Sequence, residues 1–584
     1  HENTAVKQTN DLRFRTVGQK VFRAYKAEDE DDKPDKIASS VFITVSLFKL
    51  KTLWGPSCNQ ESEAVTTARI NKLKELHASD IESLRRYDDM YPDLNHKSTS
   101  DVLLICISSS PNGIVHEPYP LMCTDMTYGW NCEERYVRLP YSVCNIVDGI
   151  PRYRIMKNAI SKLLEPLKSY EEIEVCIKSY SNIKCFDALK YFFDIFLDAG
   201  VRAKYLSSVV PFIAKLALQS PLLITQPLPL LRRGQSCSVT MSQHQAASLL
   251  AHAFFCTYPS RNNLNNRFSL INFNRLFSMR TANVVEKLRC LLHYFDVISE
   301  KMPEGLLSFR RQNDSVQCVW SSLQLPLSPL YVSSVGSIED SGYGMLEVDF
   351  ANKYIGGGVL SSGCVQEEIR FLIYPELIIS MLLCEKLDNN EAVVICGAER
   401  FSNYVGYGSS FRWCPMEIKN PLPRDRFRRL CCELVAMDAL PFYNKQKQFN
   451  IDAVNRELFK VAAYVGFAVK DDTFKPVATG KWGCGAFGGD LDLKSMIQLM
   501  ASSARKRPLC YFTFGDSKFA EDFRKVYRAL VNAEISVGEL YDMIGEYCFK
   551  HDKHNSLRLF KFILSKLENT THYGKYQSRQ KMVS

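Results

Sequence analysis

The chain has 584 residues, of which 46% are hydrophobic and 23% charged, and its formal net charge is +9 at pH 7. These proportions are typical of a globular protein, and they exclude a wholly disordered, collagen-like or coiled-coil chain. The length allows roughly two to four domains. No window reaches the ~18 uninterrupted apolar residues of a membrane span. The best candidate, residues 212–231, contains Lys215 and several prolines.

The 20 cysteines are scattered and show no C-x-x-C spacing of a zinc or redox site. The N-terminal sequence is polar and has no secretory signal. These features favour reduced thiols in an intracellular protein over a disulfide framework. The chain begins with His1 and not with Met, which leaves open whether it is a fragment of a longer protein.

The N-terminal half divides into a polar segment and a helical block. Residues 1–36 end in the charge cluster KAEDEDDKPDK, which predicts a mobile charged tail. A strand is predicted at 40–54 and a helix at 61–90. Apolar residues at three- and four-residue spacing then predict helices within 153–219 and at 240–258. Gly200 is a predicted C-cap in the first of these regions, and Ser242 a predicted N-cap in the second.

Strands and helices alternate after about Gly305, which predicts an α/β layered domain with ligand-binding loops at the strand ends. The predicted strands are 344–350, 391–396, 433–439 and 509–514. The predicted helices are 366–387, 451–467 and 491–505, and a helical tail follows Phe519.

The densest chemical signal is the segment VDFANKYIGGGVLSSGCVQEEIR at 348–370. A strand that contains Asp349 precedes three glycines at 356–358, and after seven residues Gln366, Glu367 and Glu368 open a helix. Glycines let a backbone approach a bulky ligand such as a diphosphate. A glycine run alone is more often a tight turn, and acidic residues alone are favoured at a helix start by its dipole. The combination favours a functional site.

Neighbouring residues of a helix point about 100° apart, so Glu367 and Glu368 cannot do the same job. One can hold a substrate hydroxyl while the other reaches a scissile bond. Cleavage of a glycosidic bond requires a carboxyl group that protonates the leaving oxygen. A partly desolvated carboxyl beside another carboxylate has the raised pKa that this role needs.

A second glycine-rich element, TGKWGCGAFGGD at 479–490, directly precedes a helix. Its backbone N–H groups and the helix N-terminus predict an anion site, which Phe487 could cover. A glycine-rich turn with Phe487 and Trp482 packed into the core is an equally good interpretation of this loop alone. Tyr407 and Phe514 follow predicted strands and could hold a nucleobase, although core packing is more common for a single aromatic residue. We find no metal-ligand pattern in the sequence.

Together these segments resemble the poly(ADP-ribose) glycohydrolase family. The resemblance rests on GGG-x7-QEE after VDFAN, and on EEIRFLIYPELIIS, GAERFSNYVGY, ATGKWGCGAFGGD, YFTFGD, TMSQHQAASLLAHAFFCT and INFNRLF. It covers about 136–516 and implies an α/β macrodomain, a mixed sheet flanked by helices, preceded by a mostly helical accessory domain. The predicted division is a mobile charged tail at 1–36, an extension of unknown role at 37–100 that shows no such resemblance, a helical accessory domain at 101–285, and an ADP-ribose-binding catalytic macrodomain with a helical C-terminal tail at 286–584.

The resemblance implies cleavage of the ribose–ribose O-glycosidic bonds of poly(ADP-ribose), with release of ADP-ribose and no metal or organic cofactor. Glu368 would be the general acid and base, Glu367 would hydrogen-bond a ribose hydroxyl, and Asp349 would support the same corner. The further implied substrate contacts are Asn352 and Gln366, Gly357 and Gly358 at the diphosphate, Lys481, Trp482, Gly483, Cys484, Gly485 and Ala486 in the second loop, Ile338 and Glu339 at the adenine, Tyr407 and Phe514 on the adenosine side, and Phe487 on the ribose side. Lys481 is a departure, because the family usually has Asn at this position.

Two other functions compete with the hydrolase. One is a macrodomain that reads ADP-ribose or its polymer without turnover, and the adjacent glutamates argue against it because a reader needs no acid. The other is a nucleic-acid-binding protein, which the positive charge permits but no RRM, KH or zinc-finger pattern supports. The expected partners are poly(ADP-ribose) chains on modified proteins, with ADP-ribose as product. We expect a monomer in the nucleus or cytoplasm that engages neither a membrane nor a specific nucleic-acid sequence. Endo- versus exo-cleavage stays open.

Overall fold

The computed structural model describes residues 75–85, 94, 100–110, 113–118, 134–259, 267–313, 318–416, 422–465, 475–551 and 557–569. The predicted tail at 1–36 and the predicted strand at 40–54 lie outside these residues. Within the predicted helix at 61–90, the described part is a short helix, α4 (Ala78–Leu84).

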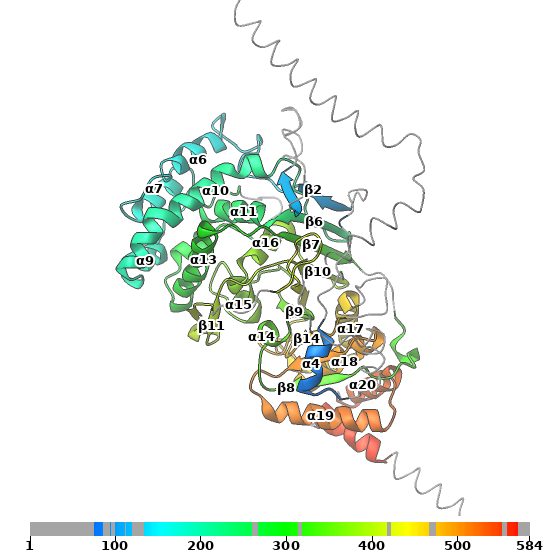
Figure 1. The fold of residues 1–584 in the computed structure, drawn as a ribbon. Coiled ribbons are helices and arrows are strands. Elements are labelled where there is room, and N and C mark those ends of the chain that lie inside the picture. Colours follow the sequence, from blue (N-terminus) through cyan, green and yellow to red (C-terminus); the bar gives the residue numbers. More distant parts are fainter. Residues whose placement is uncertain are drawn as a thin grey trace, which may run out of the picture. The chain divides into compact units, whose positions relative to one another are not determined.

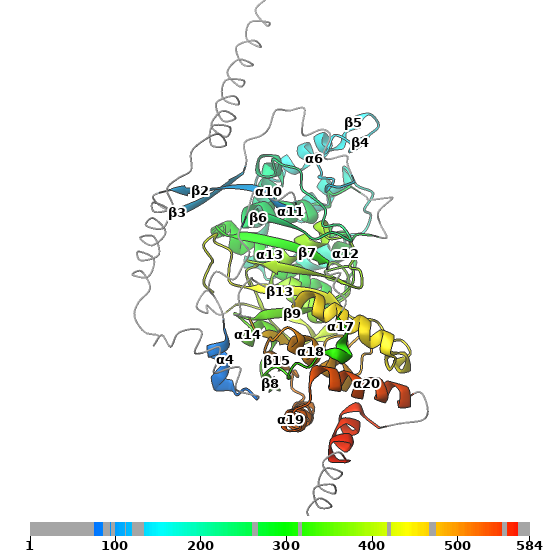
Figure 2. The ribbon, with the colours of Figure 1, turned by 90° about the vertical axis from the view of Figure 1, so that its right-hand side faces the viewer.

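A nine-stranded mixed sheet forms the centre of the described structure. Its strands, in spatial order, are β1 (Asp101–Leu103), β6 (Cys237–Ser242), β7 (Leu306–Asn313), β10 (Glu391–Cys396), β13 (Glu433–Asp438), β9 (Leu346–Ala351), β14 (Val477–Thr479), β15 (Leu509–Phe512) and β8 (Leu330–Ser333). Figure 2 shows them succeeding one another from β6 to β8. Strands β13, β9, β14, β15 and β8 are mutually parallel, so their carboxyl ends meet at one edge. Strands β7 and β10 are antiparallel to their neighbours.

Helices lie beside both ends of this sheet (Figure 1). Those before β9 are α6 (Arg152–Ser161), α7 (Glu171–Lys178), α8 (Asp187–Tyr191), α9 (Ala199–Lys204), α10 (Val210–Leu223), α11 (Gln243–Phe254), α12 (Asn274–Ser278), α13 (Ala282–Glu300) and α14 (Ile338–Ser341). Those after it are α15 (Gln366–Ile373), α16 (Ile379–Leu383), α17 (Ile451–Val465), α18 (Leu491–Ala504), α19 (Ser517–Asn532) and α20 (Val537–His551). Three two-stranded hairpins complete the described strands: β2 (Ile105–Ser110) with β3 (Gly113–Pro118), β4 (Ile146–Val147) with β5 (Ile150–Pro151), and β11 (Asn403–Val405) with β12 (Arg412–Cys414).

Most predicted elements are present, and the differences have local causes. Ser242 is the N-cap of α11, as predicted, because its hydroxyl accepts a hydrogen bond from Gln245 N at 3.0 Å. The prediction for Gly200 was wrong. Asp198 caps a new helix by accepting from Val201 N at 2.9 Å, and this places Gly200 inside α9. The helix predicted at 366–387 is broken at Pro375, since proline disfavours helical backbone in the residue before it.

The helical stretch Ala199–Leu223 is long and apolar enough to cross a membrane by length and composition, with a mean hydropathy of 1.4 in its best window. In the structure 44% of that window is buried inside the protein. Ile213 and Leu216 of α10 belong to the main core, so part of this stretch packs against it. Among the described cysteines sixteen are free thiols, and Cys144 is disulfide-bonded, which is an exception to the predicted reduced state.

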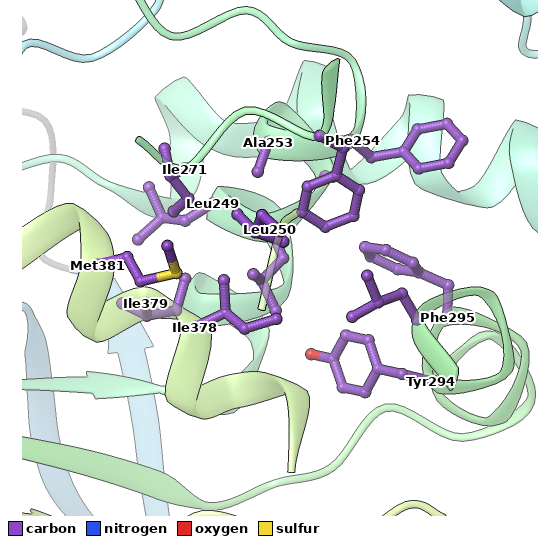
Figure 3. Packing of buried hydrophobic residues seen from close by; sticks show 14 of the residues in the cluster. Leu249, Leu250, Ala253, Phe254, Ile271, Tyr294, Phe295, Ile378, Ile379 and Met381 are labelled. Carbon is purple, nitrogen blue, oxygen red and sulfur yellow. The ribbon is translucent and has the colours of Figure 1, made fainter. Parts of the chain in front are cut away.

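One large core joins the helices before β9 to the helices that follow it. Side chains of α11, such as Leu250 and Phe254, point toward Tyr294 and Phe295 of α13 and toward Ile378 and its neighbours (Figure 3). The same core contains Val359, Leu360 and Cys364, which lie in the loop between β9 and α15. The glycine-rich loop is therefore anchored to the helical part of the protein. The predicted domain division at 285/286 stays a prediction. Strand β6 precedes this boundary and β7 follows it, and the two strands pair directly in the central sheet.

Candidate active site

A cavity of about 610 Å³ lies at the carboxyl ends of the parallel strands. Loops that leave β9, β14 and β15, together with the start of α15, supply most of its wall. Ligands of open α/β sheets bind at this edge, because the strand ends are spanned there by loops with free backbone groups. The predicted site residues that line the cavity are Glu339, Gln366, Tyr407, Lys481, Trp482, Gly483, Cys484, Gly485, Ala486, Phe487 and Phe514.

Glu367 is held by the backbone of the loop that leaves β9. Its side chain is only 2% exposed. Its Oε2 accepts from Asn352 N at 2.8 Å, and its Oε1 accepts from Gly356 N at 2.6 Å. Both carboxylate oxygens therefore receive an N–H group from the strand–helix connection, which fixes the orientation of the side chain.

Glu368 is held in the same way by two other N–H groups. Its Oε1 accepts from Gly358 N and its Oε2 accepts from Val365 N, each at 2.8 Å. Two neighbours of Glu368 line the cavity. They are Val365, which directly precedes α15, and Ile369, which directly follows Glu368. Glu368 itself is only 6% exposed. This places a fixed carboxyl beside the cavity wall.

The close approach of loop and carboxylates requires glycine at two positions. Gly357 has φ +49°, and a Cβ atom there would lie 2.7 Å from Oε2 of Glu367. A Cβ atom on Gly363 would lie 2.8 Å from Oε1 of Glu368. Real Cβ atoms do not tolerate such distances, so any side chain would displace the loop from the two glutamates.

Burial raises the pKa of two carboxyl groups in this cluster, those of Asp349 and Glu367. Asp349 is fully buried, and neither of its carboxyl oxygens has a hydrogen-bond partner. Burial raises its pKa well above the ordinary value; the charge of Arg370 opposes this shift and that of Glu368 adds to it. The pKa of Glu367 is also raised well above its usual value, first by burial and then by the charges of Asp349 and Glu368. Both shifts favour the protonated forms of Asp349 and Glu367.

The second glycine-rich loop, between β14 and α18, supplies Lys481 to Phe487 to the cavity wall. Trp482 is fully buried and its Nε1 donates to the Met437 carbonyl at 3.1 Å, which ties the loop to β13. Lys481 pairs with Asp516. Asp490 is the N-cap of α18 and accepts from Leu493 N at 2.9 Å. The loop thus ends on a capped helix N-terminus, an arrangement that favours anions.

Two exposed aromatic residues flank the cavity. The side chain of Tyr407 is 56% exposed and that of Phe514 is 42% exposed. Core packing, the competing interpretation for these residues, is wrong for both. The Tyr407 hydroxyl accepts from Gln366 N at 3.1 Å, so it is already engaged with the start of α15. Phe514 has φ +52° and lies over Gly480, where a Cβ atom would come within 2.7 Å of its ring.

Comparison with known proteins gives two matching family models. The model described as the poly(ADP-ribose) glycohydrolase helical domain matches residues 197–311, and the one described as the macro domain fold of the same enzyme matches residues 317–521. Poly(ADP-ribose) glycohydrolase 1 of Arabidopsis thaliana is 33% identical over 467 residues, which are 65% of this chain and 85% of that protein. The chain belongs to the poly(ADP-ribose) glycohydrolase family.

Other relatives agree with this assignment. Probable poly(ADP-ribose) glycohydrolase 2 of Arabidopsis thaliana is 33% identical, over 64% of this chain and 84% of that protein. Poly(ADP-ribose) glycohydrolase 1 of Caenorhabditis elegans is 36% identical over 58% of this chain, which spans 44% of the worm protein. The order of the two models confirms the expected fold class, a helical domain followed by a macrodomain.

Some residues that the glycohydrolase resemblance implies lie outside the cavity lining. These are Ile338, Asp349, Asn352, Gly357, Gly358, Glu367 and Glu368. All except Ile338 belong to β9, the loop after it or the first turn of α15, directly behind the wall. Ile338 is buried in a small core with Leu76 and Ile81. The role of each residue stays a prediction.

Sequence reasoning missed two residues at this glycohydrolase site. The hydroxyl of Tyr404 donates to Oε1 of Glu339 at 2.5 Å, and both residues line the cavity. The ammonium group of Lys287, in α13, donates hydrogen bonds to carbonyl oxygens of the loop between β9 and α15. A signal for Lys287 was available, because Val284 and Leu291 place it on the buried face of an amphipathic helix.

Proposed function

We propose that this chain hydrolyses the ribose–ribose O-glycosidic bonds of poly(ADP-ribose) and releases ADP-ribose by carboxylate acid/base catalysis. The observation that carries the proposal is the pair Glu367 and Glu368, each held by two backbone N–H groups beside the cavity. A protein that only bound ADP-ribose would need the glycine loops but no fixed pair of buried carboxyls. Family membership supports the same activity.

In the proposed reaction, Glu368 gives its proton to the leaving ribose oxygen and then takes one from the attacking water. Glu367 holds a hydroxyl of the reacting ribose, and the charge of the buried Asp349 contributes to the raised pKa of Glu367. The oxocarbenium-like sugar is positive, and the substrate's own diphosphate stabilises it while the loop 481–486 keeps the diphosphate in place. Every proton in this scheme passes through a side chain of the chain or through water.

We expect the cavity, with its volume of about 610 Å³, to hold the rest of an ADP-ribose unit. Tyr407 and Phe514 offer exposed rings on which an adenine can stack, and such stacking contributes about 1–3 kcal/mol per base. Glu339 lines the same cavity, and its carboxylate can accept from the adenine amino group. Phe487, in the loop between β14 and α18, also lines the cavity, and in this proposal it covers the ribose.

One assay tests the proposal. The purified chain is incubated with poly(ADP-ribose), and the products are resolved by size against an ADP-ribose standard. Release of ADP-ribose is the expected result, and the intermediate lengths distinguish cleavage at chain ends from internal cleavage. Tight binding of polymer without any shortening would instead favour a reader.

A further inference from the structure

Lys287 is a fully buried lysine whose ammonium group lies under the glycine-rich loop. Its Nζ donates to the carbonyl oxygens of Gly358 and Val359 at 3.1 Å each and of Ser361 at 2.8 Å, and also to that of Gly363. An ammonium group has three N–H donors, so four converging carbonyls use all of them. Lys287 belongs to α13, in the region that matches the helical-domain model.

The loop presents its two kinds of backbone group to two different partners. Four of its carbonyls bond Lys287, while the N–H groups of Gly358 and Val365 bond Glu368. Gly363 connects the two sides, because its carbonyl accepts from Lys287 and its Cα faces Oε1 of Glu368. Without the ammonium group, several buried carbonyls would lose their partner, and the loop would have to turn to find others.

We propose that Lys287 is a positioning residue for Glu368: by holding the carbonyls of residues 358–363, it holds the loop whose N–H groups orient the catalytic carboxyl. The proposal rests on the proposed function. If it holds, a residue of the helical part of the protein helps to position the catalytic carboxyl. Burial lowers the pKa of Lys287 to about 8, and the charges of Cys364 and Glu368 act in the opposite direction. The ammonium is therefore largely charged at neutral pH.

Substituting Lys287→Met tests this role, because it keeps the length of the side chain but removes its charge and donors. We expect kcat for poly(ADP-ribose) to fall about 10²-fold, the size of effect that a 1 Å displacement of a reacting group produces. The dissociation constant for ADP-ribose, measured by calorimetry, should change less than about threefold, since Tyr407, Phe514 and the loop 481–487 keep their positions.

Lys460→Met is the matched control. Lys460 of α17 is also fully buried, donates to the carbonyls of Glu391 (2.8 Å) and Asp388, and pairs with Asp438, without lining the cavity. We expect it to lower thermal stability while kcat of the folded protein stays within about twofold of wild type. An equal loss of kcat in the two folded variants would overturn the proposal, because it would reveal a merely structural effect.

Gly363→Ala provides a second test that leaves Lys287 in place. The new Cβ atom would lie 2.8 Å from Oε1 of Glu368 and 2.9 Å from Cα of Gly358, so it pushes the loop away from the carboxyl. We expect the same selective loss of kcat. If Lys287→Met does not fold, this variant still tests whether the position of the loop controls Glu368, which the role of Lys287 requires. Wild-type kcat in either folded variant would overturn the role of Lys287 but leave the proposed function intact. A wild-type chain that releases no ADP-ribose would overturn both.

Discussion

Nζ of Lys481 lies 3.0 Å from Oδ2 of Asp516, and this ion pair joins the loop after β14 to the start of α19. Asp516 is also the N-cap of α19 and accepts from Phe519 N at 3.0 Å. The Phe519 N–H group and the lysine together hold the pKa of Asp516 below its usual value. Lys481 stands where the family resemblance implies asparagine. Its positive charge is balanced by Asp516 within the protein, so less of that charge is available to a bound diphosphate.

Asp516→Asn should release Lys481 toward the substrate. Asparagine caps a helix as well as aspartate does, so α19 keeps its cap while the ion pair is lost. We expect ADP-ribose to bind about threefold more tightly at low salt, because an exposed pair of this kind is worth about 0.2–1 kcal/mol. Calorimetric titration at two ionic strengths measures the effect. Lys481→Met should act in the opposite direction, and unchanged affinity in both variants would show that the lysine does not reach the diphosphate.

Glu368→Gln should abolish most of the turnover. Glutamine keeps the shape of the side chain but cannot cycle a proton, so we expect kcat to fall by about 10² or more while ADP-ribose still binds. Because both carboxylate oxygens accept from N–H groups, the new amide must face one donor, and we expect a modest loss of thermal stability as well. Glu368→Asp is the companion variant, since it retains an acid but withdraws it from the loop. Near wild-type turnover in the glutamine variant would refute the assignment.

Phe514→Ala separates a stacking residue from a packing residue. The ring is 42% exposed at the cavity, so we expect ADP-ribose affinity to fall by about one to two orders of magnitude with little change in melting temperature. Phe512, two residues earlier and 2% exposed, is the control. Its truncation to Ala should cost about 3–5 kcal/mol of stability with little specific change in affinity. The opposite pattern in the two variants would remove Phe514 from the adenosine site.

Tyr407→Phe tests what the hydroxyl does. In the structure that hydroxyl accepts from Gln366 N, so its loss leaves the first N–H group of α15 without this partner. We expect the loss of this hydrogen bond to cost about 0.5–1.5 kcal/mol. Because Gln366 directly precedes the two glutamates, both kcat and the affinity for ADP-ribose should fall. Kinetics and calorimetry on the same preparation measure both quantities. A change confined to affinity would indicate that the hydroxyl instead bonds the substrate.

Glu376 should make stability depend on pH. Burial raises its pKa from 4.5 to about 8, although Glu399 N donates to its carboxylate at 2.8 Å and Gln243 Nε2 does so at the same distance. A carboxyl whose pKa rises on folding stabilises the protein fully below the unfolded value, and this contribution is lost as pH rises through the folded value. Glu376→Gln has no such dependence. The melting temperature of wild type relative to this variant should therefore fall between about pH 5 and pH 8, and a constant difference would contradict the assignment.

Local pattern was enough to predict much of this protein. Strand β10 was predicted with its observed bounds, and the order of strands and helices after residue 305 predicted an α/β layer, because burial and side-chain periodicity are local properties. The two glycine-rich loops and the QEE helix start were recognisable for the same reason, since each depends on residues within a few positions of one another. Three of the four strands that the sequence predicts in this half end in loops that line the cavity.

Tertiary structure alone decided which distant groups meet. Lys287 precedes Gly358 by 71 residues, and Lys481 precedes Asp516 by 35, so no local pattern pairs them. Whether an aromatic residue stacks or packs also depended on the fold: Phe512 and Phe514 have the same side chain, but the left-handed backbone of Phe514 turns its ring out to the cavity rim. The sequence determines which residues are available to a site. The distances between their side chains and the pKa values of their titratable groups depend on burial and on which segments pack together, and these are properties of the whole fold.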